Sequence, residues 1–125
     1  MISGIGIDIV HVDRIRRWIE NPAILNRFFH PLEIETARSR NKDMALSLAA
    51  RFAAKEAFGK ALGSGLVHFA LVEVAVTNDS LGRPHMQLEG NALREFERHG
   101  GGTIHVSITH EGDNAVAVVI LEQRG

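Results

Sequence analysis

The segment that most constrains the fold is residues 43–62, DMALSLAARFAAKEAFGKAL, which holds seven alanines and no proline. Alanine has the highest helix propensity, and Met44, Leu48 and Phe52 recur every four residues along one side. We therefore expect one long helix here. It should end at Gly63–Gly65, because glycine is the usual residue just past a helix C-terminus.

Shorter elements are expected on both sides of this helix. Before it, the apolar patterns predict a strand over 2–10 and helices over 12–21, 24–29 and 31–40. After it, they predict strands over 71–77 and up to Leu88, a helix over 90–99, and a hairpin of 103–109 with 115–121. This order predicts an α+β fold, with a largely antiparallel sheet packed against one long helix and several short ones.

Length and composition exclude several classes of protein. With 125 residues and no linker or repeat, we expect one domain, 1–125. A net charge of −1 argues against a nucleic-acid partner held by bulk electrostatics. The lack of cysteine excludes disulfides and thiolate metal sites. No apolar run approaches the ~20 residues of a membrane span and no basic signal precedes Asp8, so we expect a cytoplasmic protein without a membrane partner.

Asp8 is unusual because it lies inside an apolar strand. The preceding glycines in GIGID suggest a dinucleotide-binding loop, but the third glycine of that motif and a parallel crossover are missing. A buried ionised carboxylate is costly unless a cation or strong hydrogen-bond donors meet it. Asp8 is therefore either a metal ligand or a strand-end hydrogen-bond acceptor, and the residues alone leave both open.

Glu56 and Lys60 are the second unusual pair. They are four residues apart, so they share a helix face, and taken alone they are best interpreted as a weak surface ion pair. However, Phe52 and Gly63 lie on the same side, so this carboxylate belongs to an apolar row. Two acids on different elements with a nearby lysine suit Mg²⁺, which binds one or two carboxylates and shares its remaining positions with phosphate oxygens and water.

Five segments lie in order along nearly the whole chain: GIGIDIV, FHPLE, RFAAKEAFGKALGSG, NDSLGRP and HVSITHEGD. In this order and at about this spacing they resemble the bacterial holo-acyl-carrier-protein synthases, a family of 4′-phosphopantetheinyl transferases. The resemblance implies Mg²⁺-dependent transfer of phosphopantetheine from coenzyme A to a serine of apo acyl carrier protein in lipid biosynthesis, with release of adenosine 3′,5′-bisphosphate. It also implies a homotrimer with active sites at the subunit clefts.

The resemblance implies roles for single residues. Asp8 and Glu56 match the two metal-binding acids, and Lys60 matches a catalytic lysine that meets the phosphates. Glu33 matches an acid that orients the serine hydroxyl or a metal-bound water; its alternative interpretation is an ordinary helix-start acid.

Coenzyme A is expected, from the same resemblance, to contact residues along much of the chain: Arg51, Lys60, Gly82, Arg83, Pro84 and His110. In the family the histidine often comes from a neighbouring subunit. The turn 82–84 is equally well interpreted as a plain hairpin turn with an exposed Arg83. The other six histidines lack zinc-ligand spacing, and none is expected to bind a metal.

A basic outer face is predicted for the first helix, formed by Arg14, Arg16 and Arg17. Such a face is usually just solvated. Because an acyl carrier protein is acidic and the family docks it on this helix, we expect Arg14 and Arg17 to bind that partner.

Two other functions compete with this one. A metal-dependent nucleotide hydrolase would use the same acids and lysine without needing a basic docking helix. A non-catalytic trimeric binding module would keep the fold and lose the metal dependence.

Overall fold

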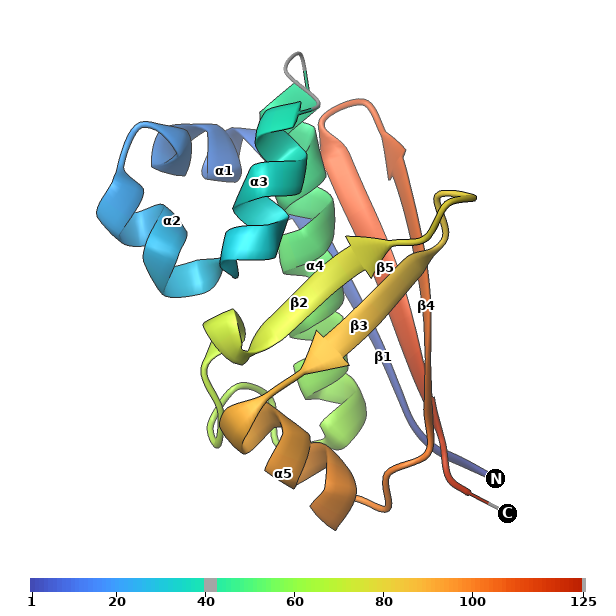
Figure 1. The fold of residues 1–125 in the computed structure, drawn as a ribbon. Coiled ribbons are helices and arrows are strands. Elements are labelled where there is room, and N and C mark those ends of the chain that lie inside the picture. The colour runs from blue at the N-terminus through green and yellow to red at the C-terminus, as the bar shows by residue number, and fades with distance from the viewer. Residues whose placement is uncertain (40–42, 125) are drawn as a thin grey trace.

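The computed structural model describes residues 1–39 and 43–124 and has the predicted α+β fold with antiparallel sheets (Figure 1). The helices are α1 Val12–Ile19, α2 Pro22–Phe28, α3 Pro31–Ser39, α4 Met44–Leu62 and α5 Gly90–Arg98. The strands are β1 Ile2–His11, β2 Val74–Asn78, β3 Pro84–Leu88, β4 Thr103–Glu111 and β5 Asn114–Glu122. The helix end expected at Arg40 lies outside the described residues. No helix in the described ranges is both long and apolar enough to span a membrane.

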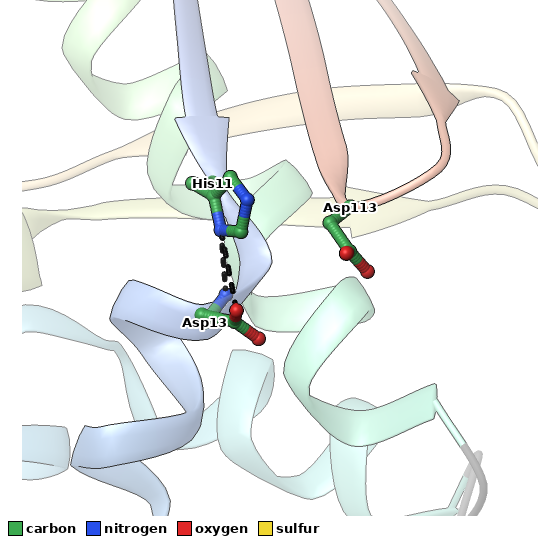
Figure 2. Close-up of side chains that lie close together, drawn as sticks. All are labelled: His11, Asp13 and Asp113. Carbon is green, nitrogen blue, oxygen red and sulfur yellow. Dashed lines mark hydrogen bonds and ion pairs between the residues drawn. The ribbon is translucent and has the colours of Figure 1, made fainter.

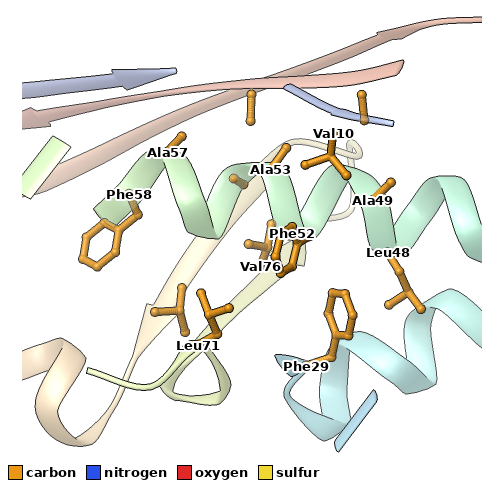
Figure 3. Close-up of a cluster of buried hydrophobic side chains, with 14 of the residues drawn as sticks. Val10, Phe29, Leu48, Ala49, Phe52, Ala53, Ala57, Phe58, Leu71 and Val76 are labelled. Atoms are coloured by element: carbon orange, nitrogen blue, oxygen red, sulfur yellow. The ribbon is translucent and has the colours of Figure 1, made fainter. Parts of the chain in front are cut away.

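The strands form two separate sheets rather than one. The larger has the order β1-β5-β4 and the smaller pairs β2 with β3, and all neighbours are antiparallel. Helix α4 lies between them, with β1 and β5 on one side and α1, α3 and β2 on the other (Figures 1 and 3). Both sides of α4 are therefore covered by other elements.

The expected strand over 71–77 is wrong in its first three residues. Leu71–Glu73 form a 3₁₀ turn, and β2 begins only at Val74. The Glu73 carboxylate holds this turn, because it accepts hydrogen bonds from the backbone N–H of Ala70 at 2.9 Å and of Asn91 at 2.8 Å. The contacts of the Glu73 side chain, one of them with a residue 18 positions away, hold a turn where the β-branched pattern predicted a strand.

Helix α4 carries small side chains toward the larger sheet. Ala49, Ala53 and Ala57 point to the strands, whereas Phe52 and Phe58 point to the opposite layer (Figure 3). All five are buried. The alanine face lets the sheet approach the helix closely.

Two glycines complete this close contact from the side of β1. A Cβ atom at Gly4 would lie 2.0 Å from the carbonyl oxygen of Ala61, and one at Gly6 would lie 2.0 Å from that of Ala57. No side chain fits between the strand and the helix backbone at these positions. The glycines of GIGID are therefore packing residues.

We expect Gly6→Ala to lower the free energy of unfolding by about 2 kcal/mol or more, since overpacking a tight core typically costs ~1–3 kcal/mol. Urea denaturation measures this change. In an uncrowded strand the same substitution would stabilise the protein slightly, because it reduces the entropy of the unfolded chain. A neutral or stabilising result would therefore contradict the close packing.

A fully buried ion pair joins α3 to α4. The Lys55 Nζ lies 2.6 Å from Glu33 Oε1, and both side chains are 0% exposed. Lys55 also donates to the carbonyl of Phe28, while Glu33 accepts from the backbone N–H of His30 and of Val76. Burial lowers the pKa of Lys55, and the negative charge of Glu33 opposes that shift. These two side chains tie α2, α3 and β2 to the long helix.

We expect Lys55→Met to cost about 3–5 kcal/mol of stability, because it leaves the Glu33 carboxylate buried without its cation. The double variant Lys55→Met/Glu33→Gln should be more stable than the single one, since the uncompensated charge is gone. Chemical denaturation of both variants checks the order. A single variant within about 1 kcal/mol of the parent protein would show that the pair matters little.

Candidate active site

Three of the predicted site residues meet where β1 crosses α4. Asp8 follows Gly4 and Gly6 at alternate positions of β1, so it faces the helix. The Lys60 Nζ lies 2.9 Å from Asp8 Oδ1 and 3.1 Å from the carbonyl oxygen of Ile7. The Asp8 side chain is 18% exposed and that of Lys60 55%, so the pair is open to solvent on one side.

Glu56 belongs to the same group. Its carboxyl is half-buried, and its pKa is raised first by burial and then by the charge of Asp8, while Arg14 and Lys60 act in the opposite direction. The two carboxylates repel each other at a partly exposed position. Their oxygens are hard ligands, and a bound divalent cation would relieve the repulsion. Asp8 and Glu56 therefore fit the metal ion that the sequence predicted.

The arginines of α1 are not equivalent. The Arg14 guanidinium carbon lies 5.5 Å from the ring centroid of Trp18 and 5.1 Å from that of Phe52, and its charge acts on Glu56. Arg16 instead pairs with Asp13 at 2.6 Å. Arg17 is exposed. The three arginines of the expected basic face thus have different surroundings. Among the contacts described for them, only those of Arg14 reach the Asp8–Glu56 group.

A cavity of about 630 Å³ gathers four of the residues expected to contact coenzyme A: Arg51, Gly82, Pro84 and His110. They come from α4, the β2–β3 turn with the start of β3, and β4. Arg83 and Lys60 are not among the described lining residues. Arg83 lies in the turn itself, where its backbone N–H donates to Asp79 Oδ1 at 2.9 Å.

Arg51 is held in the wall of this cavity by two side chains that sequence reasoning missed. Its guanidinium donates to Ser47 Oγ at 2.8 Å and to Asn78 Oδ1 at 2.6 Å. Ser47 lies one turn before Arg51 on the same helix, which is a spacing that the sequence could have revealed. Asn78 comes from β2, and only the fold brings it here.

The Asp8 group and the large cavity are separate within one chain. A second hollow of about 420 Å³ is lined by Ile7, Asp8, Ile9, Lys60 and Val116, and shares no described residue with the first. Arg51 and Lys60 are two and a half helical turns apart, roughly 13 Å along the axis of α4 at 1.5 Å per residue. One chain therefore holds Asp8 and Lys60 in one place and Arg51, Gly82, Pro84 and His110 in another.

Glu33 is not brought to either place. Its side chain is fully buried, and its two oxygens accept hydrogen bonds from Lys55, His30 and Val76. The contact with the backbone N–H of His30, at the start of α3, matches the alternative interpretation as a helix-start acid. This burial leaves no surface through which the carboxylate could touch a substrate.

His11 lies near two acidic residues, one of which, Asp113, is brought to it only by the fold. His11, Asp13 and Asp113 each offer one ligand atom within 4.8 Å of the others, all on exposed residues (Figure 2). The contacts described for them are structural: His11 Nδ1 accepts the N–H of Asp13 at the start of α1, and the Asp113 carbonyl accepts that of Val12. They fasten the β4–β5 turn to the β1–α1 junction.

Known proteins resemble this chain over nearly its whole length. A family model described as the 4′-phosphopantetheinyl transferase superfamily matches residues 4–119. A Treponema denticola protein named holo-[acyl-carrier-protein] synthase is 52% identical over 122 residues, which cover 98% of this chain and 99% of the relative.

Solved structures resemble the fold over the same length. The holo-[acyl-carrier-protein] synthase of Neisseria meningitidis has a TM-score of 0.89 at 33% identity, covering 98% of this chain and 100% of the other. That of Bacillus anthracis, solved in complex with coenzyme A (3′,5′-ADP), has a TM-score of 0.80 at 32% identity and covers 99% of both chains. The chain therefore belongs to the 4′-phosphopantetheinyl transferase superfamily, among the enzymes named holo-[acyl-carrier-protein] synthases.

Proposed function

We propose that this enzyme transfers 4′-phosphopantetheine from coenzyme A to a serine hydroxyl of an apo acyl carrier protein and releases adenosine 3′,5′-bisphosphate. We further propose that it uses Mg²⁺, acts as a single domain in the cytoplasm, and serves lipid biosynthesis. The observation that carries the proposal is the meeting of Asp8, Glu56 and Lys60 in a chain of this family. The names of the relatives and the coenzyme A complex of the Bacillus anthracis protein support the two substrates.

The acids and the lysine have distinct tasks in this reaction. Asp8 and Glu56 would hold Mg²⁺, which when bound neutralises the pyrophosphate and makes the phosphorus more electrophilic. Lys60 is exposed and its ammonium group already lies beside Asp8, so it would stabilise the charge that develops on the leaving bisphosphate. Glu33 would act indirectly, because its pair with Lys55 fixes the helix that carries Glu56.

The large cavity suits the nucleotide end of coenzyme A. Arg51 places a fixed positive charge in the wall of this cavity, and His110, from strand β4, also lines it. Gly82 has a φ of +84°, which allows the tight turn between the two strands of the smaller sheet. Arg83, between Gly82 and Pro84, would reach the phosphates from this turn.

A trimer would bring the two separate places together. Ile5, Ile7 and Ile9 project from the sheet face opposite α4 and are 61–65% exposed. An apolar strand face of this kind is typical of a subunit interface. We propose that three copies pack through it, so that the Asp8 group of one copy faces the cavity around His110 of the next.

The carrier protein would dock on α1. Its acidic surface would be attracted to Arg14 and Arg17, and this attraction should weaken as ionic strength rises. Because Arg14 also lies beside Glu56, docking there would bring the acceptor serine toward the metal-binding acids.

The decisive experiment is the intact mass of an apo acyl carrier protein after incubation with the enzyme, coenzyme A and Mg²⁺. A gain of one phosphopantetheine supports the proposal, and omission of Mg²⁺ or addition of EDTA should abolish it. Cleavage of coenzyme A without any carrier protein would indicate a hydrolase instead. Coenzyme A binding without transfer, unaffected by Mg²⁺, would indicate a binding module.

We expect Glu56→Gln to reduce transfer by roughly two orders of magnitude or more, because it removes a negative charge that holds the metal. Partial rescue by high Mg²⁺ should follow. Glu35→Gln, a change at an exposed acid of α3, is the matched control and should leave transfer unchanged. Near-normal turnover of Glu56→Gln at low Mg²⁺ would remove Glu56 from the metal site.

The same variant should be more stable than the parent when no metal is bound. The pKa of Glu56 lies above its ordinary value of 4.5, so its ionisation opposes folding at neutral pH. The Tm of metal-free Glu56→Gln should therefore exceed that of the parent at pH 7. The difference should disappear below about pH 4, where the carboxyl is protonated in the folded and the unfolded chain alike.

The shared site of the trimer predicts complementation. Asp8→Ala and His110→Ala should each be inactive, but a mixture of the two should regain part of the activity, because every hybrid trimer contains one intact cleft. Native mass spectrometry checks that the subunits exchange. Exchange without any recovered activity would contradict a site built from two copies.

A further inference from the structure

The guanidinium of Arg14 is seated on two aromatic rings. Its central carbon is 5.5 Å from the Trp18 centroid and 5.1 Å from the Phe52 centroid, and the two rings meet edge to face at 5.3 Å. A cation over aromatic faces at these distances is attracted by the ring quadrupoles. Arg14 is exposed as a residue, and its charged end lies over these two rings.

The surroundings of the Arg14 guanidinium come from two pairs of residues, and the members of each pair are one helical turn apart. Arg14 and Trp18 are one turn apart on α1, and Phe52 and Glu56 are one turn apart on α4, so the pairs face each other where the two helices pack. Phe52 is buried and Trp18 half-buried. The positive charge of Arg14 consequently acts to lower the pKa of Glu56, whereas the guanidinium of Arg16 forms an ion pair with Asp13.

We propose that Trp18 is a positioning residue for the carrier protein: its ring, with that of Phe52, holds Arg14 ready to receive an acidic surface beside the metal-binding acids. This inference rests on the proposed function. A free arginine side chain loses several rotatable bonds when it binds, and one that is already stacked has less freedom to lose. Trp18 should therefore affect capture of the protein substrate and leave the chemical step alone.

The test is steady-state transfer by Trp18→Leu, measured separately for the two substrates. The KM for apo carrier protein should rise about three- to tenfold, while kcat and the KM for coenzyme A stay within about twofold of the parent. Trp18→Phe keeps an aromatic face and should restore most of the affinity. High ionic strength should shrink the difference between Trp18→Leu and the parent, because the lost interaction works through a charge.

Two further variants separate positioning from plain packing. In the background of Arg14→Ala, Trp18→Leu should add little to the KM, since the two side chains act together. Phe28→Leu is the matched control. The ring centroids of Phe28 and Trp18 are 5.0 Å apart, and no stacking of Phe28 with Arg14 is described. It should lower thermal stability and leave the KM for the carrier protein unchanged.

Equal effects of Trp18→Leu and Phe28→Leu on that KM would overturn the inference, as would a Trp18→Leu effect that persists without Arg14. Either result would leave the proposed function standing, because the parent enzyme would still modify the carrier protein. Failure of the parent enzyme to transfer phosphopantetheine would instead overturn the proposed function and this inference with it.

Discussion

Contact between strand β1 and helix α4 without intervening side chains is the constraint on which the rest of the structure depends. Gly4 and Gly6 lie against the carbonyl oxygens of Ala61 and Ala57, so the backbones themselves set the spacing. Asp8, two residues further along β1, is thereby brought within 2.9 Å of Lys60. The close backbones fix where Asp8 and Lys60 start from, and the long, 55% exposed side chain of Lys60 completes the contact. A backbone position fixed in this way suits the catalytic role that we propose for this group.

Helix α4 carries a buried structural residue and a candidate site residue at neighbouring positions. Lys55 turns inward to its buried pair with Glu33, and Glu56 turns outward to Asp8, so consecutive residues face different sides of one helix. The inward pair fixes α2, α3 and β2 around the helix, and the outward residue uses the resulting rigidity. Helix α4 can fulfil both tasks although it is covered on both sides, because the small side chains of its alanine face let the sheet come close.

Much of the architecture could be predicted from the sequence, because it follows from local periodicity. Helix α4 begins one residue after its predicted start and ends at Leu62, as expected. What local patterns could not predict are contacts between distant segments. Asn78 reaches Arg51, and Glu73 reaches Asn91, only in the folded chain. The same reason explains why one sheet was expected and two are found, and why the burial of Glu33 was not foreseen.

The pairing of β1 with β5 has a consequence for the order of folding. Asp8 lies opposite Ala117, so the first strand finds its sheet neighbour in the last one, across nearly the whole length of the chain. Contacts between such distant segments form late, because closing a long loop costs entropy before any pairing rewards it. The helices and the β2–β3 hairpin can form from nearby residues, whereas the pairing of β1 with β5 joins the two ends of the chain. We therefore expect Asp8 to be among the last residues of the candidate site to reach its place.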